Sequence, residues 1–315
     1  MFIPVQTTPV DKAGPHEENK PSVLSHSSQV IKVQAAKEYS IRAKKDKETC
    51  CISGVCEIAT GKVLISDSLN KRVKLLDHNY TVDAYCDMPG LPLSMCSIDS
   101  SLVAVALRFD GIHFVRLTNG QLTKDKTLQL EHDLSGLTYH HGNLYVTSGA
   151  ALFHYTVDGR LVSKLYEVTA ETMPSCAVSA DGERIYLVCY GPNQLVTLSK
   201  NGTVISIMKE PSLDWGDQLA FHGLHVTEMG SLDSGDKLLL HGLHVTEMGQ
   251  VLVCGFVSNK IIQVDRDGRQ RLAEVVTEKD DVDRPIPVSV YYSKHTGTLI
   301  VGMLENDSIF VFTTQ

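Results

Sequence analysis

A short pattern of alternating branched aliphatic residues returns six times along this chain of 315 residues. Each copy begins at a turn residue and runs as a strand-like stretch, and a second such stretch follows after a polar break. The copies occupy residues 61–67, 101–107, 142–147, 182–188, 249–254 and 297–302. A period of about forty residues, with the periodicity of strands rather than helices, predicts an all-β, six-bladed β-propeller.

The polar breaks between the aliphatic stretches carry hairpin chemistry. Asn-Gly or Asp-Gly stands at 119–120, 158–159, 201–202 and 267–268, and these residue types tolerate the positive φ that two-residue hairpin turns require. In the first unit we expect strands at 52–58, 63–66, 72–76 and 81–86. Each unit is therefore expected to be a four-stranded antiparallel sheet with its first strand innermost.

The last unit begins near Pro287 and has room for three strands before the sequence stops. A further strand-like stretch at 29–42 precedes the first unit and can supply the missing fourth strand. Pairing of these two stretches would close the ring and remove two exposed sheet edges, which otherwise promote aggregation. We therefore expect one propeller domain over 29–315, closed by the N-terminal strand.

Two segments depart from the repeat. Residues 1–28 contain four prolines and many Ser and Thr, with little apolar periodicity, which predicts a disordered lead-in. Residues 212–230 are followed at once by a near copy at 231–249, with fifteen of nineteen positions identical, either a tandem duplication or an error in the gene model. Because the second copy runs directly into the strand at 251–254, we expect it to hold the inner strand of blade five, while the first copy bulges out as an insertion.

Charge and composition narrow the function classes. The net charge is −8, and the first 48 residues hold 8 Lys and Arg against 6 Asp and Glu, so residues 49–315 carry −10. Such a ring is a poor general binder of polyphosphate, which requires clustered cations. No apolar stretch reaches the roughly 20 residues that span a bilayer, and the N-terminus lacks a secretory signal pattern. The eight cysteines include no C-x-x-C pair and are expected to be free thiols, so we expect a cytoplasmic protein with no membrane partner.

The recurring residues distinguish among propeller families. A single tryptophan, Trp215, excludes a ring of Trp-Asp repeats, and the paired glycines of kelch blades are absent. An aliphatic strand followed by a polar turn with Asn and then by Val or Ile occurs at 67–77 and again at 254–265, and this unit resembles the NHL repeat. Further phrases at 70–76, 176–179 and 249–255 make the stretch 29–315 similar to the C-terminal propeller of invertebrate tripartite-motif proteins.

This resemblance implies a function as well as a fold. The propeller of tripartite-motif ubiquitin ligases recognises substrates, so the resemblance implies a non-catalytic protein–protein interaction module that binds a protein or peptide and needs no cofactor. The RING finger, B-box and coiled coil that precede such propellers have no counterpart in this sequence, and no ligase catalysis is expected of it. Two alternatives stay open: a single-stranded RNA-binding propeller, and a metal-dependent six-bladed hydrolase of the lactonase type.

Candidate binding residues lie in the loops that join the second and third strands of the blades. There we expect exposed Arg, Tyr and Asn side chains on a rigid scaffold, where interface anchors usually sit. The candidates are Asn70, Lys71, Arg72, Arg108, Tyr190, Asn193, Asn259 and Lys260. If the partner were RNA, the cations Lys71, Arg72 and Arg108 would contact phosphate and Tyr190 would stack on a base.

No set of residues predicts catalysis or a bound metal. The histidines at 222 and 225, and those at 241 and 244, are three apart and fall on opposite faces of a strand. Cys50, Cys51 and Cys56 lack zinc-finger spacing, and the acidic run 278–284 lacks the glycine of a calcium loop. The expected inner strands contain one carboxylate, Glu57, whereas a hard cation in a central tunnel requires several oxygen ligands.

Overall fold

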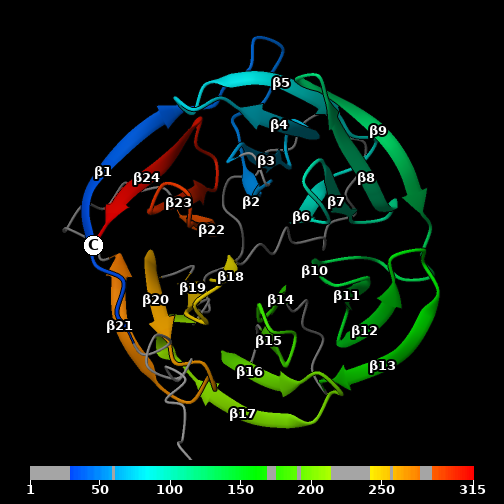
Figure 1. Ribbon diagram of the computed structural model, residues 1–315, viewed down its shortest axis with the longest axis vertical. Coiled ribbons are helices and arrows are strands. Elements are labelled where there is room, and N and C mark those ends of the chain that lie inside the picture. Colours follow the sequence, from blue (N-terminus) through cyan, green and yellow to red (C-terminus); the bar gives the residue numbers. More distant parts are fainter. Residues whose placement is uncertain are drawn as a thin grey trace, which may run out of the picture.

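The computed structural model describes residues 29–58, 61–168, 175–189, 193–213, 242–255, 258–276 and 286–315. These residues form six four-stranded antiparallel sheets, which stand as blades around a central axis (Figure 1). Within these ranges the helical structure consists of one 3-10 turn, η2 (Pro211–Leu213). The expected all-β, six-bladed β-propeller is confirmed.

In every blade the chain begins at the axis and passes outwards through successive strands, and blade six takes its outermost strand from the beginning of the chain. Blades one to three are β2 (Ile52–Glu57), β3 (Val63–Asp67), β4 (Arg72–Leu76) and β5 (Val82–Asp87); β6 (Pro92–Ser97), β7 (Leu102–Leu107), β8 (Gly111–Thr118) and β9 (Gln121–Leu128); and β10 (Gly136–His140), β11 (Asn143–Ser148), β12 (Ala151–Thr156) and β13 (Leu161–Glu167). Blades four to six are β14 (Ser175–Val178), β15 (Arg184–Cys189), β16 (Gln194–Ser199) and β17 (Val204–Lys209); β18 (Leu243–Val245), β19 (Val251–Gly255), β20 (Lys260–Val264) and β21 (Arg271–Val276); and β22 (Pro287–Ser293), β23 (Thr298–Met303), β24 (Ser308–Thr314) and β1 (Val33–Ser40).

The ring is closed by β1, which pairs antiparallel with β24 from Ser40 opposite Ser308 to Val33 opposite Thr314. Two backbone hydrogen bonds extend this pairing, from the Ile41 amide to the Asp307 carbonyl at 2.8 Å and from the Gln315 amide to the Lys32 carbonyl at 2.9 Å. Blade six is thus built from both ends of the described chain (Figure 1). The expected closure by the N-terminal strand is confirmed.

The inner strand of blade five comes from the second copy of the duplicated segment. Within that copy, β18 pairs antiparallel with β19 and is the innermost strand of its sheet. Residues 214–241, which include most of the first copy, lie outside the described residues, so the expected insertion remains a prediction. The expected disordered lead-in at 1–28 lies outside them as well.

Small residues let the inner strands approach one another around the axis. Each inner strand has Gly or Ser at the equivalent register position: Gly54, Ser94, Gly136, Ser175, Gly242 and Ser289. A Cβ added at Gly242 would lie 2.9 Å from Ser289 Cα in the next blade. Where Ser occurs, its hydroxyl can bridge blades, as when Ser289 Oγ donates to the Ile52 carbonyl at 2.6 Å. Only side chains of this size fit the crowded axis.

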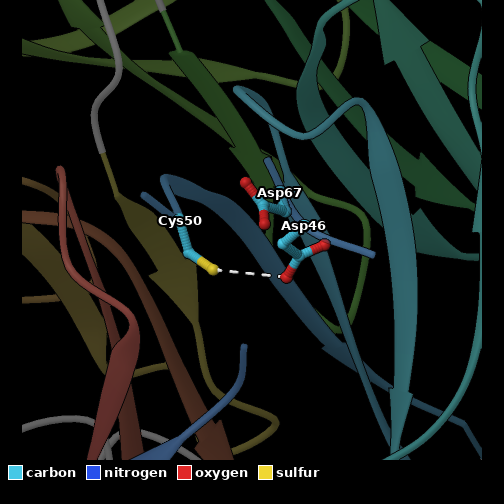
Figure 2. Close-up of side chains that lie close together, drawn as sticks. All are labelled: Asp46, Cys50 and Asp67. Atoms are coloured by element: carbon cyan, nitrogen blue, oxygen red, sulfur yellow. Dashed lines mark hydrogen bonds between the residues drawn. The ribbon is translucent and has the colours of Figure 1, made fainter. Parts of the chain in front are cut away.

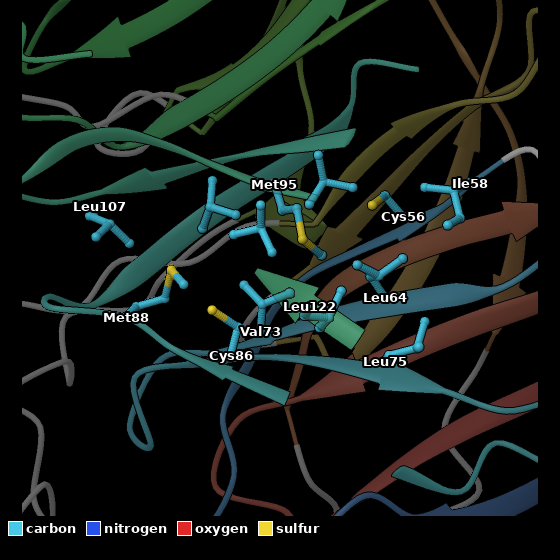
Figure 3. Close-up of a cluster of buried hydrophobic side chains, with 13 residues drawn as sticks. Cys56, Ile58, Leu64, Val73, Leu75, Cys86, Met88, Met95, Leu107 and Leu122 are labelled. Carbon is cyan, nitrogen blue, oxygen red and sulfur yellow. The ribbon is translucent and has the colours of Figure 1, made fainter. Parts of the chain in front are cut away.

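The apolar core lies between the blades. Between blades one and two, thirteen buried residues, among them Leu64, Leu75 and Met95, form one continuous cluster (Figure 3). Comparable clusters join blade one to blade six and blade two to blade three. Because burial of apolar surface stabilises a fold by about 25 cal/mol per Å², the blades hold one another in place, and each depends on both of its neighbours.

Removal of β1 is expected to destabilise the whole ring. A chain lacking residues 1–40 would leave β24 as an open edge and separate blade six from the segment that continues into blade one. We expect a lower urea midpoint and concentration-dependent self-association, because an unpaired strand edge can pair with another chain. A chain lacking only residues 1–28 is the control and should retain the urea midpoint of the full chain. Equal midpoints for the two truncations would contradict the closure mechanism.

Candidate functional site

The loops between the second and third strands gather on one face of the ring, which we call the loop face. Their described residues include 68–71, 108–110, 149–150, 193, 258–259 and 304–307. Each described loop contains, or is followed directly by, a residue in the left-handed region: Lys71 (φ 50°), Gly111 (76°), Gly149 (53°), Asn193 (52°), Asn259 (51°) and Glu305 (47°). Asn and Gly adopt this conformation most easily. The turn geometry therefore accounts for Asn193 and Asn259, two of the candidate binding residues.

The Asn70 side chain makes hydrogen bonds to the backbone of the segment that joins β1 to β2. Its Oδ1 accepts hydrogen bonds from the Lys47 and Glu48 amides, both at 3.0 Å, and its Nδ2 donates to the Glu48 carbonyl at 3.0 Å. A further bond joins Nδ2 to Asp67 Oδ2 at 2.9 Å. All of these partners belong to blade one or to the segment that joins β1 to β2, so Asn70 anchors that segment.

The two arginines expected to be exposed on the loop face are buried. Arg72 is 8% exposed; its guanidinium contacts Asp46 Oδ1 at 2.5 Å and Asp87 Oδ1 at 2.7 Å and lies 4.4 Å from the Tyr85 ring centroid. Arg108 is 6% exposed. Charged groups leave water only when partners replace it, and the sequence pattern did not reveal these partners.

Of the candidates Lys260 and Tyr190, the first is ion-paired and the second lies outside the described residues. Lys260 forms an ion pair with Glu274 at 3.1 Å, across the β20–β21 hairpin. Tyr190 lies outside the described residues, so its expected role remains a prediction.

An aromatic side chain that the sequence analysis did not single out is prominent on the loop face. Phe109 is 58% exposed, and the Arg108 guanidinium carbon lies 5.0 Å from its ring centroid. The other strongly exposed large apolar side chains among the described residues are Leu161, Val162, Val204, Ile207 and Met248, which lie on outer strands or on the β18–β19 turn. Phe109 lies in the 108–110 loop, next to the candidate Arg108, and an aromatic residue in a polar turn was the signal that the sequence offered.

A buried charge network lies beneath the loop face and is centred on Lys74. The Lys74 Nζ contacts Asp46 Oδ2 at 2.6 Å, Asp67 Oδ2 at 2.7 Å and Cys50 Sγ at 3.3 Å, and it donates to the Ile41 carbonyl at 3.0 Å. The side chains of Lys74, Asp46 and Asp67 have no exposed surface. The network therefore joins blade one to the segment that arrives from blade six.

Asp46, Cys50 and Asp67 also have the composition of a metal site, because one ligand atom from each lies within 4.8 Å of the others (Figure 2). The Lys74 ammonium already supplies the positive charge between the two carboxylates. Burial raises the pKa of the Cys50 thiol far above its ordinary value, although Lys74 opposes this effect, so Cys50 is a neutral thiol. Burial alone would raise the pKa of Asp46, but hydrogen bonds from Lys74, the Ala43 amide and Arg72 lower it. Asp46 and Asp67 therefore belong to an internal ion pair with Lys74 rather than to a metal site.

A central cavity of about 220 Å³ lies on the ring axis, lined by residues of all six inner strands. Small and apolar side chains predominate, and Glu57 is the single Asp, Glu, Lys or Arg in the lining. A hard divalent cation needs several converging oxygen ligands, so the residues present do not fit the metal of a lactonase-type hydrolase. The cysteines of the lining are equally unsuited to nucleophilic chemistry, because burial raises the pKa of Cys56 and Cys176 to about 12.

The polar groups of the cavity come from neighbouring blades. The Glu57 side chain is 4% exposed, and its Oε1 lies 2.9 Å from His295 Nδ1, outside hydrogen-bond geometry. The His244 ring centroid is 4.6 Å from that of Tyr291. His244 Nε2 is buried and receives no hydrogen bond from the described residues, and desolvation lowers the pKa of His244 to about 4. The other three histidines of the two His-x-x-His pairs, at 222, 225 and 241, lie outside the described residues. The acidic run 278–284 lies outside them as well.

The fold is shared with known propellers. No protein-family model and no curated protein matches the chain. Virginiamycin B lyase from Staphylococcus aureus is 13% identical, with a TM-score of 0.58 over 89% of this chain and 99% of the lyase. A protein of unknown function from Bacteroides thetaiotaomicron is 11% identical, with a TM-score of 0.64 over 89% and 76%. The β-propeller domain of Cps50 (Swd1) from Myceliophteria thermophila is 9% identical, with a TM-score of 0.56 over 84% and 83%.

At these identities the structural likeness establishes the β-propeller fold. The resemblance to tripartite-motif propellers remains a hypothesis. No helix in the described part of the chain is long and apolar enough to cross a membrane.

Replacement of Lys74 is expected to destabilise the protein strongly. Lys74→Met would leave the buried carboxylates of Asp46 and Asp67 without their shared cation, and breaking a buried ion pair in this way costs about 3–5 kcal/mol. Lys164→Met is the matched control, since its pair with Glu167 is exposed and such pairs contribute about 1 kcal/mol or less. Urea unfolding of the two variants at pH 7 gives the comparison. Equal losses would show that the Lys74 network does not stabilise the fold.

His244 is expected to make stability depend on pH in the mildly acidic range. An unfolded chain binds a proton at His244 near its ordinary pKa of about 6.5, whereas folded His244 does so only near 4. The unfolded state therefore binds more protons between these values, and the free energy of unfolding falls as the pH falls from about 6.5 to about 4.

His244→Phe should remove the part of the free energy of unfolding that depends on His244 protonation. This part amounts to up to about 2 kcal/mol between pH 7 and pH 5. His78→Phe, at an exposed turn position, is the control and should leave the pH dependence unchanged. The measurement is urea unfolding at both pH values. A His244→Phe protein with the pH dependence of the wild type would contradict the assignment.

Proposed function

We propose that this propeller is a non-catalytic interaction module that binds a protein or peptide through its loop face. The observation that carries the proposal is Phe109, an aromatic side chain 58% exposed on a loop of a rigid scaffold. Aromatic residues and arginine are enriched among the residues that dominate protein–protein binding energy. A large apolar ring left in water becomes favourable when a partner covers it.

The backbone that presents Phe109 is fixed before any partner arrives. The Arg108 amide donates to the Leu91 carbonyl at 3.3 Å, and the Arg108 carbonyl accepts from the Leu134 amide at 2.9 Å. These bonds connect the loop to the segments that enter blades two and three. A loop already held in one conformation loses little entropy on binding, which favours its use as an anchor.

The charges on the loop face favour a protein partner over RNA. Arg72 is paired with Asp46 and Asp87, Arg42 with Asp307, and Lys260 with Glu274. Phosphate would have to compete with these carboxylates for each of these three cations, and single-stranded nucleic acid binding requires cations that are available in a groove. The net charge of −10 over residues 49–315 acts in the same direction.

The finer proposal is that the chain recognises substrates in the manner of the tripartite-motif propellers that it resembles. Its support is the NHL-like pattern at 67–77 and 254–265. The likeness to a lyase rests on the fold, and the cavity lining, with one carboxylate, offers little support for metal-dependent hydrolysis. A cytoplasmic location is part of the same proposal.

The test is affinity purification of the tagged protein, with each lysate divided and treated with or without ribonuclease. Phe109→Ala should lose partners that the wild type retains after nuclease treatment. Leu161→Ala is the matched control, because Leu161 is 51% exposed but lies on the outer strand β13, and it should retain them. Thermal melts of both variants would verify folding.

Three results would contradict the proposal. Loss of the partners on ribonuclease treatment would favour RNA binding. Retention of the same partners by Phe109→Ala would remove Phe109 as the anchor. Loss of the partners from Leu161→Ala alone would place the interface on the outer strands.

A further inference from the structure

The outer edge of blade four is an open strand edge. β17 pairs with β16 on its inner side and is the last strand of its sheet. Two large aliphatic side chains of this strand are exposed, Val204 at 42% and Ile207 at 52%. Among the described residues, β17 therefore combines an edge that no further strand covers with apolar side chains that remain in water.

The pairing of β17 with β16 determines which backbone groups of β17 point outwards. The Glu210 amide donates to the Asn193 carbonyl at 3.1 Å, and three positions back along the same register Ile207 lies opposite Val196. Hydrogen-bonded and non-hydrogen-bonded pairs alternate in an antiparallel ladder. The amide and carbonyl groups of Ile207 and Lys209 therefore point away from β16, and a strand that arrives at this edge can bond to them.

The distribution of charge sets β17 apart from the other outer strands. Edge strands commonly carry charged residues, Lys above all, which oppose pairing with other chains. The other five outer strands each have two or more charged residues, such as Lys37 and Glu38 in β1. In β17 the only charged residue is Lys209, at the last position, and the sequence before it is Val-Ile-Ser-Ile-Met. β17 is thus the outer strand with the least protection against pairing.

The edge of β17 is complementary to itself. In an antiparallel pair centred on Ile207, the Ile207 residues of the two copies exchange backbone hydrogen bonds, and their side chains lie next to each other on one face of the sheet. Ser206 then lies opposite Met208, and Ile205 lies opposite Lys209, so no like charges oppose each other. A two-fold symmetric pair of this kind satisfies the outward backbone groups of both copies at once.

We propose that two copies of this chain associate through β17, so that the two fourth blades form one continuous antiparallel sheet. Because the paired strands run in opposite directions, the two loop faces point in opposite directions and neither lies in the interface. The dimer therefore presents Phe109 twice, and its formation does not depend on the proposed protein partner. Interfaces that bury less than about 1,200 Å² are usually weak, so we expect a reversible dimer at micromolar concentration or above.

The experiment is sedimentation velocity of the full chain over a series of concentrations, which should show a monomer in equilibrium with a dimer. Ile207→Lys removes an apolar contact and places two ammonium groups opposite each other, so it should raise the dissociation constant of the dimer by about tenfold or more. Leu161→Lys is the matched control, because Leu161 is 51% exposed on the outer strand β13, and it should associate as the wild type does. Phe109→Ala should also associate normally, which separates this interface from the loop face.

Amide hydrogen exchange of the wild type tests the same interface without a substitution. The Ile207 and Lys209 amides should exchange more slowly at high protein concentration than at low concentration. The Glu167 amide of β13 is the control: the next amide, that of Val168, donates to the Ala150 carbonyl at 2.8 Å, so the Glu167 amide points outwards by the same alternation, and its exchange should not depend on concentration.

Four results would overturn the proposal. These are a monomer at every concentration, a Ile207→Lys protein that dimerises as the wild type does, loss of the dimer in Leu161→Lys alone, and exchange at Ile207 and Lys209 that is independent of concentration.

Discussion

Closure of the ring through the pairing of β1 with β24 is the constraint on which the remaining structure depends. Because the outer strand of blade six comes from the beginning of the chain, the segment 41–51 must cross from blade six to blade one. That segment carries Asp46 and Cys50 into the Lys74 network, and its backbone is held by Asn70. Closure thus brings together charges that are distant in sequence and buries them, which costs free energy unless every group is paired.

The same constraint shapes the loop face. Arg72 forms an ion pair with Asp46 of the crossing segment, and Arg42 of that segment pairs with Asp307 in the loop between β23 and β24. Arg72, which the sequence pattern assigned to ligand binding, therefore helps to hold the ring closed. The Phe109 ring remains accessible and is positioned by a loop whose backbone is bonded to two neighbouring blades. The loop face is accordingly better suited to packing against apolar surface than to neutralising phosphates.

Close packing at the axis brings residues of different blades together inside the ring. Gly and Ser at one register level bring the six inner strands together, so side chains two or three positions further along converge on a small shared space. Most of these side chains are apolar or small, but Glu57, Tyr291 and His244 fall on adjacent blades. A carboxylate and an imidazole that are unremarkable in separate strands are thereby buried close to one cavity. Glu57 Oε1 and His244 Nε2 have no hydrogen-bond partner among the described residues.

The sequence by itself determined the all-β class, the count of six blades, closure by the N-terminal strand and the strand positions of blade one to within a residue. These features follow from local periodicity and turn chemistry, which residues near in sequence decide. Tertiary structure alone decided which charged side chains are buried. Arg72 and Arg108 were expected on the surface and are buried, Arg72 because ring closure brings Asp46 beside it. It alone gathered Glu57, Tyr291 and His244, more than two hundred residues apart along the chain at their extremes, since a closed ring makes neighbours of the first and last blades.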